Sequence, residues 1–291
     1  MHANKRTRFD AAVAGLQQRH GAQVLVPARA VNTRPAAIAT GFAQLDALLE
    51  IGGVPLNALS VLSGPCTSGK LTLGYKILSH AQQPASRLQE ESFPPASLPM
   101  PSAKSAKGAA RREAASRQTP HTVVIVDLHD NTDPDYLARC GIHLDYLLLA
   151  RPRSIRQAFE LVLDIVRSGQ SHAILLDSLA GEKNFPNAAR TAYALLPQLR
   201  QLLSQAGCAV ILLDQPYPLW QHWVQRLTGS SLAAQADLHV EVQHERWLER
   251  AAQIYGYQAQ VKVLRNRWGR SSVATSIAIE FNGTVKARDT L

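Results

Sequence analysis

The 291-residue sequence contains little cysteine and no long hydrophobic segment. Its three cysteines, Cys66, Cys140 and Cys208, form no C-x-x-C pair and are odd in number, which argues against a disulfide scaffold or a zinc cluster. The basic start of the chain leads into no long apolar run, so we expect neither a signal peptide nor a transmembrane span. These absences predict a cytoplasmic protein with no membrane partner.

Acidic residues are fewer than basic ones. The chain has 31 lysines and arginines against 22 aspartates and glutamates, which gives a formal net charge of +9. This excess favours an acidic partner, with nucleic acid ahead of an anionic membrane, although solubility alone is the alternative explanation. The length suits one large domain with a substantial core.

Large apolar residues almost disappear over residues 83–120, which are rich in Pro, Ser, Ala, Lys and Arg. Such a segment cannot offset its ordering entropy by burial, so we predict a disordered insertion. Its six basic and three acidic residues leave a net charge of +3. A solvated spacer and a basic arm that contacts nucleic acid both remain open for it.

A glycine-rich loop follows the apolar run 59–63 and precedes a helix-compatible segment, 70–82. This order of strand, loop and helix is typical of a phosphate-binding P-loop, in which backbone N–H groups and a lysine surround phosphate oxygens. An empty, vestigial loop is the alternative. The residues expected to hold the nucleotide phosphates are Gly64, Pro65, Thr67, Ser68, Gly69, Lys70 and Thr72.

One position of this loop departs from the pattern. A P-loop places Ser or Thr after the lysine to bind Mg²⁺, and here that residue is Leu71, which cannot bind a metal. Thr72 follows it but points elsewhere on the helix and is a poor substitute ligand. The sequence therefore predicts nucleotide binding and weakened catalysis.

Apolar strands and helices alternate through the rest of the chain. The expected strands cover 122–127, 146–150, 172–177 and 208–214, and the expected helices cover 135–140, 154–168 and 188–205. Alternating strands follow over 237–243, 257–265 and 272–281. The pattern predicts an α/β fold, with a mainly parallel sheet covered by helices on both faces and an antiparallel C-terminal extension. Ligands of such sheets bind at the carboxyl ends of the strands, where the loop, Asp127, Asp177 and Gln215 lie.

These elements and motifs resemble the RecA recombinase family from about residue 8 to residue 285, without the insertion. The motifs that carry the resemblance are Thr40-Gly41-Phe42 with Leu45-Asp46, Gly52 to Pro55, Thr132 to Tyr136 with Arg139 to Gly141, Ile174 to Ser178, Leu212 to Gln215, and Arg265 to Arg267. The resemblance implies three parts. Residues 1–35 form a helix, strand and connector that contact the next protomer, residues 36–82 and 121–285 form an ATP-binding P-loop NTPase core, and residues 83–120 are inserted.

The resemblance also implies roles for single residues around ATP. Tyr136 is expected to stack on adenine and Asp133 to accept from its amino group, although a tyrosine packed at a helix start is the alternative. Asp177 is expected to bind Mg²⁺ through water, since a carboxylate at the end of a buried strand is costly unless it is paired or near a metal.

Three further residues are implied in catalysis. Gln215 is similar to the family's sensor of the γ-phosphate, and Arg265 and Arg267 stand where two lysines reach into the neighbouring protomer's ATP site. Arginine suits this task through its bidentate fork, while two exposed arginines at a strand end are the alternative.

The catalytic base is a second departure from the family. The family places a glutamate two residues after the equivalent of Asp127, and here that residue is His129. Neutral histidine accepts a proton, so hydrolysis is not excluded. Loss of a catalytic base usually costs about 10²- to 10⁴-fold in rate, so with Leu71 we expect slow or negligible turnover.

The expected DNA-binding region differs most from the family. The first DNA-binding loop, 179–187, looks abbreviated, and with only ten residues after Phe281 we expect the family's C-terminal DNA-gathering domain to be absent. The second loop, 216–236, interleaves aromatic and basic residues that suit stacking on single-stranded bases. An amphipathic helix packed on protein is an equal alternative. The DNA-binding candidates are Trp220, Trp223, Arg226, Gly229 and Ser230.

Two functions follow from the resemblance. The first is an ATP-binding protein of DNA recombination and repair that binds single-stranded DNA by self-association or in a mixed filament with a RecA protein, with weak ATPase activity. The second is a non-catalytic accessory protein of the ImuA type, which couples RecA filaments to a translesion DNA polymerase. A P-loop enzyme acting on another substrate is a third class, for which the chain suggests no substrate.

Overall fold

The computed structural model describes residues 11–19, 34–84, 120–177, 185–214, 235–281 and 286–289. The chain divides into two units, Met1–Pro35 and Ala36–Leu291. In the first unit residues 11–19 are helical, in agreement with the helix expected within residues 1–35, and Leu16 on it is exposed. The predicted strand of this unit and most of the 83–120 insertion lie outside the described residues.

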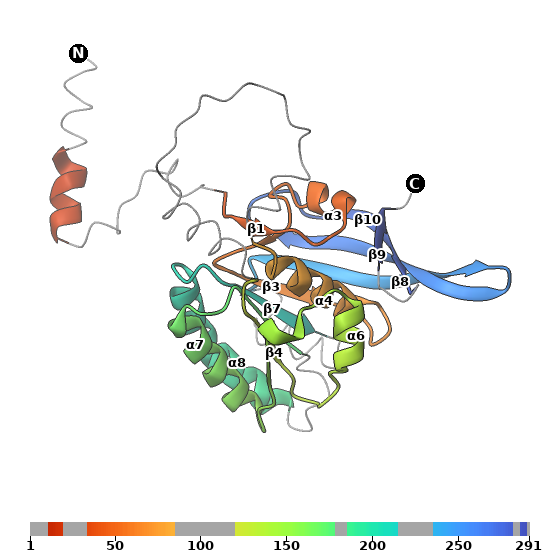
Figure 1. Cartoon of the computed structure of the whole chain (residues 1–291). Helices are drawn as coiled ribbons and strands as arrows, with labels where there is room; N and C mark the ends of the chain where they lie inside the picture. The colour runs from red at the N-terminus through yellow and green to blue at the C-terminus, as the bar shows by residue number, and fades with distance from the viewer. Residues whose placement is uncertain are drawn as a thin grey trace, which may run out of the picture. The chain divides into compact units, whose positions relative to one another are not determined.

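A nine-stranded sheet forms the centre of the second unit, with the strand order β11-β10-β9-β8-β3-β7-β6-β4-β5 (Figure 1). The strands from β5 to β8 in this order are parallel, and those from β8 to β11 are antiparallel. The bounds are β3 Ala58–Ser63, β4 Val123–Val126, β5 Leu147–Ala150, β6 Ala173–Leu176, β7 Ala209–Asp214, β8 Leu238–Arg250, β9 Gln253–Asn266, β10 Val273–Glu280 and β11 Lys286–Asp289. The predicted parallel sheet with an antiparallel extension is confirmed.

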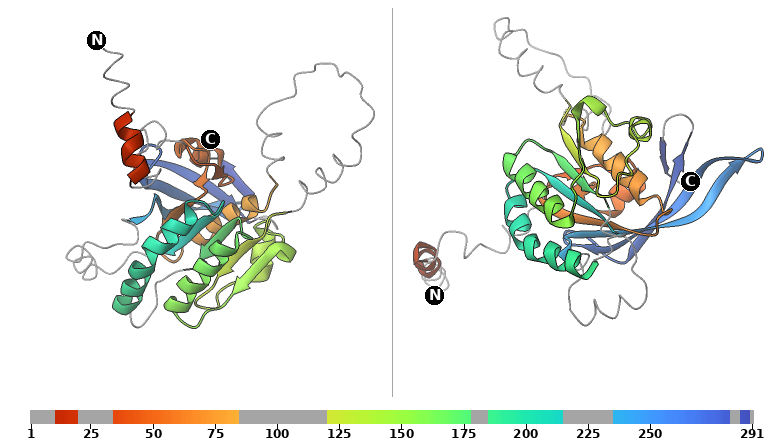
Figure 2. Two further views of the ribbon diagram at one scale, coloured as in Figure 1. Left: turned by 90° about the vertical axis from the view of Figure 1, so that its left-hand side faces the viewer. Right: turned by 90° about the horizontal axis from the view of Figure 1, so that it is seen from below.

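Helices cover both faces of the sheet (Figure 2). On one face lie α3 (Ala43–Leu48), α4 (Lys70–Ala81) and α6 (Pro134–Arg139), whose apolar side chains share one core cluster with the strands. On the other lie α7 (Ile155–Ser168) and α8 (Phe185–Leu203), in a second cluster. A 3₁₀ turn, Leu144–Tyr146, leads into β5, and β1 (Ala37–Ile38) pairs with β2 (Val54–Pro55) in a separate small sheet. Within the described residues no helix has the length and apolar character needed to cross a bilayer.

The sequence shows why α7 begins and ends where it does. The Ser154 hydroxyl accepts a hydrogen bond from the Gln157 N–H and caps the first turn, and Gly169 ends the helix in a left-handed conformation with φ of 64°. Between them the apolar stripe that includes Phe159 and Val162 is buried against the sheet. Periodicity and caps agree, which is why this helix was predicted closely.

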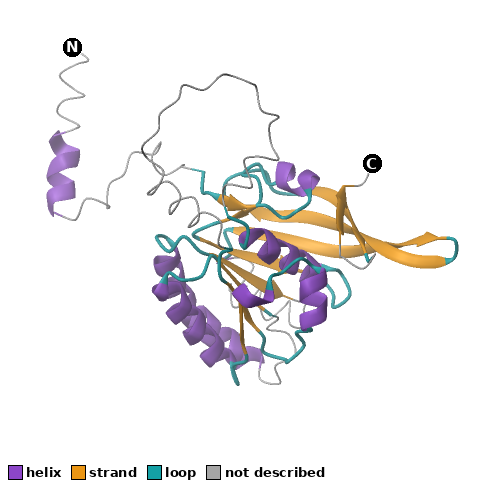
Figure 3. Cartoon of the chain, viewed as in Figure 1, coloured by secondary structure: helices purple, strands orange, loops and turns teal. Residues whose placement is uncertain are grey.

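The β8–β9 hairpin is longer than the sequence predicted and projects from the sheet (Figure 3). Its turn is made by Ala251 and Ala252, both with positive φ, where Asn or Gly is usual. The distal part of the hairpin is rich in polar and charged residues, and Trp247 and Ile254 on it are about half exposed. Strand β11 was not predicted, because its four residues carry no apolar pattern.

Candidate nucleotide-binding site

The loop between β3 and α4 is shaped by its two glycines. Gly64 has φ of 154°, and a Cβ atom there would lie 2.1 Å from the Val242 carbonyl oxygen. Gly69 caps α4 with φ of 92°, a left-handed conformation that favours glycine. Between them Ser68 is fully buried, while Pro65 and Thr67 are exposed. The predicted phosphate loop therefore has the strand, turn and helix that it requires.

The side chain of Lys70 is held by backbone carbonyl groups of the loop. The Lys70 Nζ donates to the carbonyl oxygens of Gly64 at 2.8 Å and Pro65 at 3.0 Å. Burial lowers the pKa of Lys70, and the nearby Cys66, Asp177 and Asp214 oppose that shift. An ammonium group has three protons, so one remains for a phosphate oxygen. The geometry suits an anion at the N-terminus of α4.

Leu71 and Thr72 follow Lys70 on the first turn of α4 and point to different partners. Leu71 packs against the core cluster of this face of the sheet. The Thr72 hydroxyl shares a hydrogen bond of 2.6 Å with the Tyr136 hydroxyl. Leu71 has no side-chain oxygen for a metal, and the Thr72 hydroxyl is directed to Tyr136 in this arrangement.

Asp127 organises the loop that follows β4. It is buried, and its carboxylate accepts from the backbone N–H groups of His129 at 3.0 Å and Thr132 at 2.9 Å. Burial by itself would raise the pKa of Asp127, but these bonds, with others from the Thr132 side chain and the Asn131 backbone, hold the pKa below its ordinary value. Asp127 is therefore ionised at neutral pH and fixes the backbone at His129.

Asp177 directly follows β6, and Asp214 is the last residue of the neighbouring strand β7. Both lie at the carboxyl ends of the parallel strands, near Lys70. Both carboxylates act on Lys70 by raising its pKa. The described residues contain no cluster of three or more His, Cys, Asp or Glu side chains placed to hold a metal ion. With Leu71 in the ligand position, the donor set fits Mg²⁺ poorly, and the role of Asp177 as its ligand stays a prediction.

Tyr136 and Asp133, the predicted adenine contacts, both serve α6 in this structure. The Asp133 carboxylate caps the helix by accepting from the Asp135 N–H at 3.0 Å. The Tyr136 ring lies 6.0 Å from the Tyr75 ring, and the Arg139 guanidinium sits 5.5 Å from its centroid. The cap and the Thr72 bond account for both residues locally, which strengthens the alternative of a tyrosine packed at a helix start.

Arg265 and Arg267 lie at the end of β9, where they were expected. Arg265 is exposed. Arg267 instead forms an ion pair of 3.2 Å with the buried Asp237, which also binds Arg200 at 2.9 Å and accepts from the Leu59 N–H. Arg267 would have to leave this pair to reach a neighbouring protomer.

The sequence prediction missed two residues beside the loop. The His239 Nε2 lies 2.8 Å from the Ser63 hydroxyl, and burial lowers the pKa of His239 to about 4, so its ring is neutral at pH 7. Tyr257 on β9 places its hydroxyl 2.5 Å from the position of a Cβ atom on Gly69. Neither residue belongs to a motif, and both come near the loop only through strand pairing.

The remaining predicted site residues lie outside the described residues. They are Gln215, Trp220, Trp223, Arg226, Gly229 and Ser230. Residues 179–184 of the expected first DNA-binding loop, 179–187, also fall there. Their roles stay predictions.

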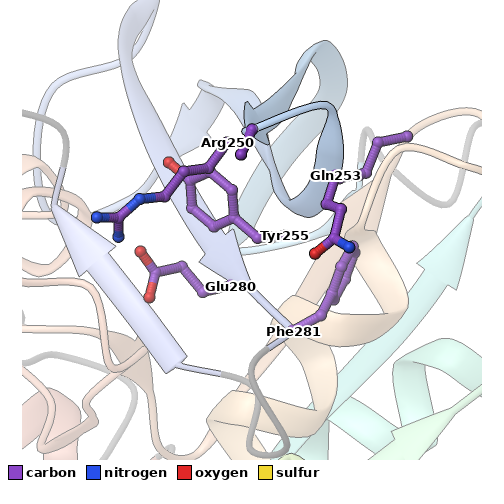
Figure 4. Close-up of a pocket in the computed structure, with 7 residues that line it drawn as sticks. Arg250, Gln253, Tyr255, Glu280 and Phe281 are labelled. Atoms are coloured by element: carbon purple, nitrogen blue, oxygen red, sulfur yellow. The ribbon is translucent and has the colours of Figure 1, made fainter.

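A pocket of about 560 Å³ lies at the turn end of the β8–β9 hairpin, beside the last residues of β10 (Figure 4). Arg250 and Glu280 point toward each other on one side of it, and Gln253 and Phe281 line the other. The centroid of the Phe281 ring lies 5.6 Å from that of the Tyr257 ring. Tyr257 in turn packs against Gly69, so the pocket wall is connected to the phosphate loop.

The comparisons with known proteins decide the family. The model of the RecA N-terminal domain matches residues 102–286. The chain belongs to the RecA family. The protein RecA of Rickettsia canadensis (strain McKiel) is 23% identical over 283 residues, covering 91% of this chain and 72% of that protein. The protein RecA of Rhodospirillum centenum (strain ATCC 51521 / SW) is 24% identical over 282 residues, covering 91% and 69%.

The fold of this RecA family member has a counterpart among solved structures. The crystal structure of the RadB recombinase superposes with a TM-score of 0.57 at 14% sequence identity, covering 87% of this chain and 100% of that one. At this identity the likeness shows the fold. The chain is therefore recombinase-like in sequence and in architecture. The family match covers the strands from β4 to β10 and begins after the phosphate loop.

Proposed function

We propose that this RecA family member binds ATP at the loop 64–72 and acts in DNA recombination and repair, binding single-stranded DNA in an ATP-linked oligomer with weak ATPase activity. The observation that carries the proposal is the placement of Lys70 at the N-terminus of α4, bonded to the carbonyl groups of Gly64 and Pro65. A phosphate chain that accepts from the Lys70 ammonium and the backbone N–H groups has the arrangement that P-loops provide.

Slow hydrolysis follows from two side chains. Leu71 turns into the core instead of offering an oxygen to Mg²⁺, and His129 occupies the position of the expected general base. A histidine imidazole is shorter than a glutamate side chain and holds its acceptor nitrogen in a ring, so it aligns a water molecule differently. Asp177 would hold Mg²⁺ through water, and with Leu71 in the usual ligand position the metal would contribute little.

The link between ATP and DNA is proposed through the second DNA-binding loop and the next protomer. Trp220, Trp223 and Arg226 would stack on and clamp single-stranded bases, with Gly229 and Ser230 in the turn, and Gln215 would sense the γ-phosphate. Across the protomer contact Arg265 would approach the ATP of the neighbour. The net charge of +9 favours an anionic polymer as the partner.

The ImuA-type accessory role is the second candidate. The ion pair between Arg267 and Asp237 favours it, because an arginine held within its own chain is not free for a neighbour's phosphate. In this role the protein binds a RecA filament and a translesion polymerase, and nucleotide turnover is dispensable.

Titration of a labelled oligo-dT with and without ATP, with ATPase measured in the same tubes, separates the two candidates. ATP-dependent binding with a steep salt dependence supports the first. Binding that ignores ATP, together with capture of a purified RecA protein or translesion polymerase, supports the second. Lys70→Ala should remove the ATP response, whereas Lys262→Ala, an exposed lysine on β9, should keep it.

A further inference from the structure

Tyr257 carries a hydroxyl group that is buried without a partner. The residue is 6% exposed, and its phenolic oxygen has no hydrogen-bond partner among the described residues. Thr72 lies close enough to act on the pKa of Tyr257, but the hydrogen bond that the Thr72 hydroxyl forms, at 2.6 Å, is with Tyr136. Buried polar groups are almost always satisfied, and an exception in a folded protein calls for an explanation such as a ligand.

The unpaired hydroxyl lies against the start of α4. A Cβ atom on Gly69 would come within 2.5 Å of the Tyr257 oxygen and 2.7 Å of its Cε2 atom. Gly69 is the cap of a 12-residue helix, at the end where backbone N–H groups attract anions. The phenol is therefore packed against the N-terminus of α4, next to the loop that would hold phosphate.

Tyr257 also sits in an aromatic cluster that reaches the surface. Its ring lies 6.1 Å from the Trp247 ring in an edge-on arrangement and 6.1 Å from the His244 ring, whose Nε2 is likewise buried without a partner in the described structure. Trp247 is 50% exposed. Packing against these rings restricts the Tyr257 side chain, so that its oxygen is held in place before a ligand binds.

We propose that the Tyr257 hydroxyl donates a hydrogen bond to the phosphate chain of a nucleotide bound at the loop, as a binding residue contributed by the antiparallel extension. The inference rests on the proposed nucleotide binding. A neutral phenol donates a strong, charge-assisted hydrogen bond to an anionic oxygen, and it does so in its ordinary protonated state. The contact involves a phosphate common to ADP and ATP.

The test measures ADP binding to the full-length protein by calorimetry. Tyr257→Phe removes only the oxygen and should weaken ADP binding about tenfold, which corresponds to the loss of one charge-assisted hydrogen bond. The same variant without nucleotide should melt at an equal or higher temperature than the natural protein, because a buried unpaired oxygen has been removed. A purely structural tyrosine would lower the melting temperature instead.

Tyr146→Phe is the matched control, because Tyr146 lies in the 3₁₀ turn before β5 and loses the same atom. It should leave ADP binding unchanged. Tripolyphosphate, which has no base or ribose, should show the same loss with Tyr257→Phe as ADP does.

Unchanged ADP or tripolyphosphate binding in Tyr257→Phe overturns the proposal, while Lys70→Ala still shows that the loop is used. Absence of nucleotide binding by the natural protein overturns the proposed function as well. The two failures are thus distinguished in one set of titrations.

Discussion

Thr72 and Tyr136 share a hydrogen bond of 2.6 Å that connects the first turn of α4 to α6. The bond joins the phosphate loop to the segment expected to hold adenine. Burial raises the pKa of Tyr136, and the Thr72 hydrogen bond works against that shift, so the phenol stays neutral at physiological pH. The ring and the hydroxyl of Tyr136 thus have separate tasks that substitutions can separate.

Tyr136→Phe should lower the free energy of unfolding by about 1 kcal/mol through loss of this hydrogen bond. If the ring stacks on adenine, ATP affinity should stay within about twofold, because phenylalanine keeps the aromatic face. Tyr136→Ala should then weaken ATP binding at least about tenfold. Urea unfolding and calorimetry measure the two effects. Equal ATP affinity in both variants would refute base stacking and leave Tyr136 a packing residue.

The paired change Leu71→Thr with His129→Glu should raise the ATPase rate well above that of the natural protein. Threonine restores a metal ligand, and glutamate restores a base, each of which supports the transition state. The increase should reach about 10²-fold, at the lower end of the usual effect of a catalytic base. Phosphate release under saturating ATP and Mg²⁺ measures it.

The single changes are the controls for that pair. Each should give a smaller increase than the two together, because metal and base act on one transition state. An unchanged rate in the double variant, with nucleotide still bound, would contradict the assignment of these two positions.

Gly69→Ala should destabilise the protein by roughly 2–4 kcal/mol, from the left-handed backbone and from overlap with Tyr257. Gly169→Ala is its matched control, since Gly169 also has a positive φ but nothing lies within 4 Å of its Cβ position. That control should lose only about 1 kcal/mol. Denaturant unfolding gives both values, and equal losses would show that contact with Tyr257 is not the cause.

His239 should make the protein acid-sensitive. Burial lowers the pKa of His239 to about 4, so the folded chain resists a proton that the unfolded chain accepts near the ordinary pKa of 6.5. Stability is then complete above about pH 6.5 and is lost as the pH falls toward 4, by about 3 kcal/mol in total. Urea unfolding between pH 7 and pH 4 measures the slope.

His239→Gln provides the comparison, because glutamine still pairs with Ser63 and does not titrate. Its stability should fall less over the same range. Some slope should persist, since burial and His121 also lower the pKa of His172. Identical pH profiles for the variant and the natural protein would rule out His239 as the sensitive group.

The parallel half of the fold could be predicted because its local signals agree. The apolar runs that became β4 and β6 are continuous, and α7 has its cap, its stripe and its final glycine in register. The phosphate loop was found for the same reason, since its residues are contiguous. Element ends in this half differed by at most three residues, as frayed termini do.

The antiparallel half was predicted less well because its signals are not local. The segment that completes the β8–β9 hairpin carries charges and a turn of two alanines, and only backbone pairing across the hairpin makes it a strand. The bond between Arg200 and Asp237 and the approach of Tyr257 to Gly69 join residues distant in sequence. A single sequence read by itself gives no means of foreseeing such contacts.

The position of β3 in the sheet has a consequence for biogenesis. Residues 58–63 are made early, yet their two neighbours in the sheet, residues 209–214 and 238–241, are synthesised after most of the chain. Such distant pairing makes folding slow, because a long loop has to close before the strands gain contacts. During translation the edges of β3 stay uncovered, and an emerging chain would depend on chaperones to keep this apolar strand from pairing with others.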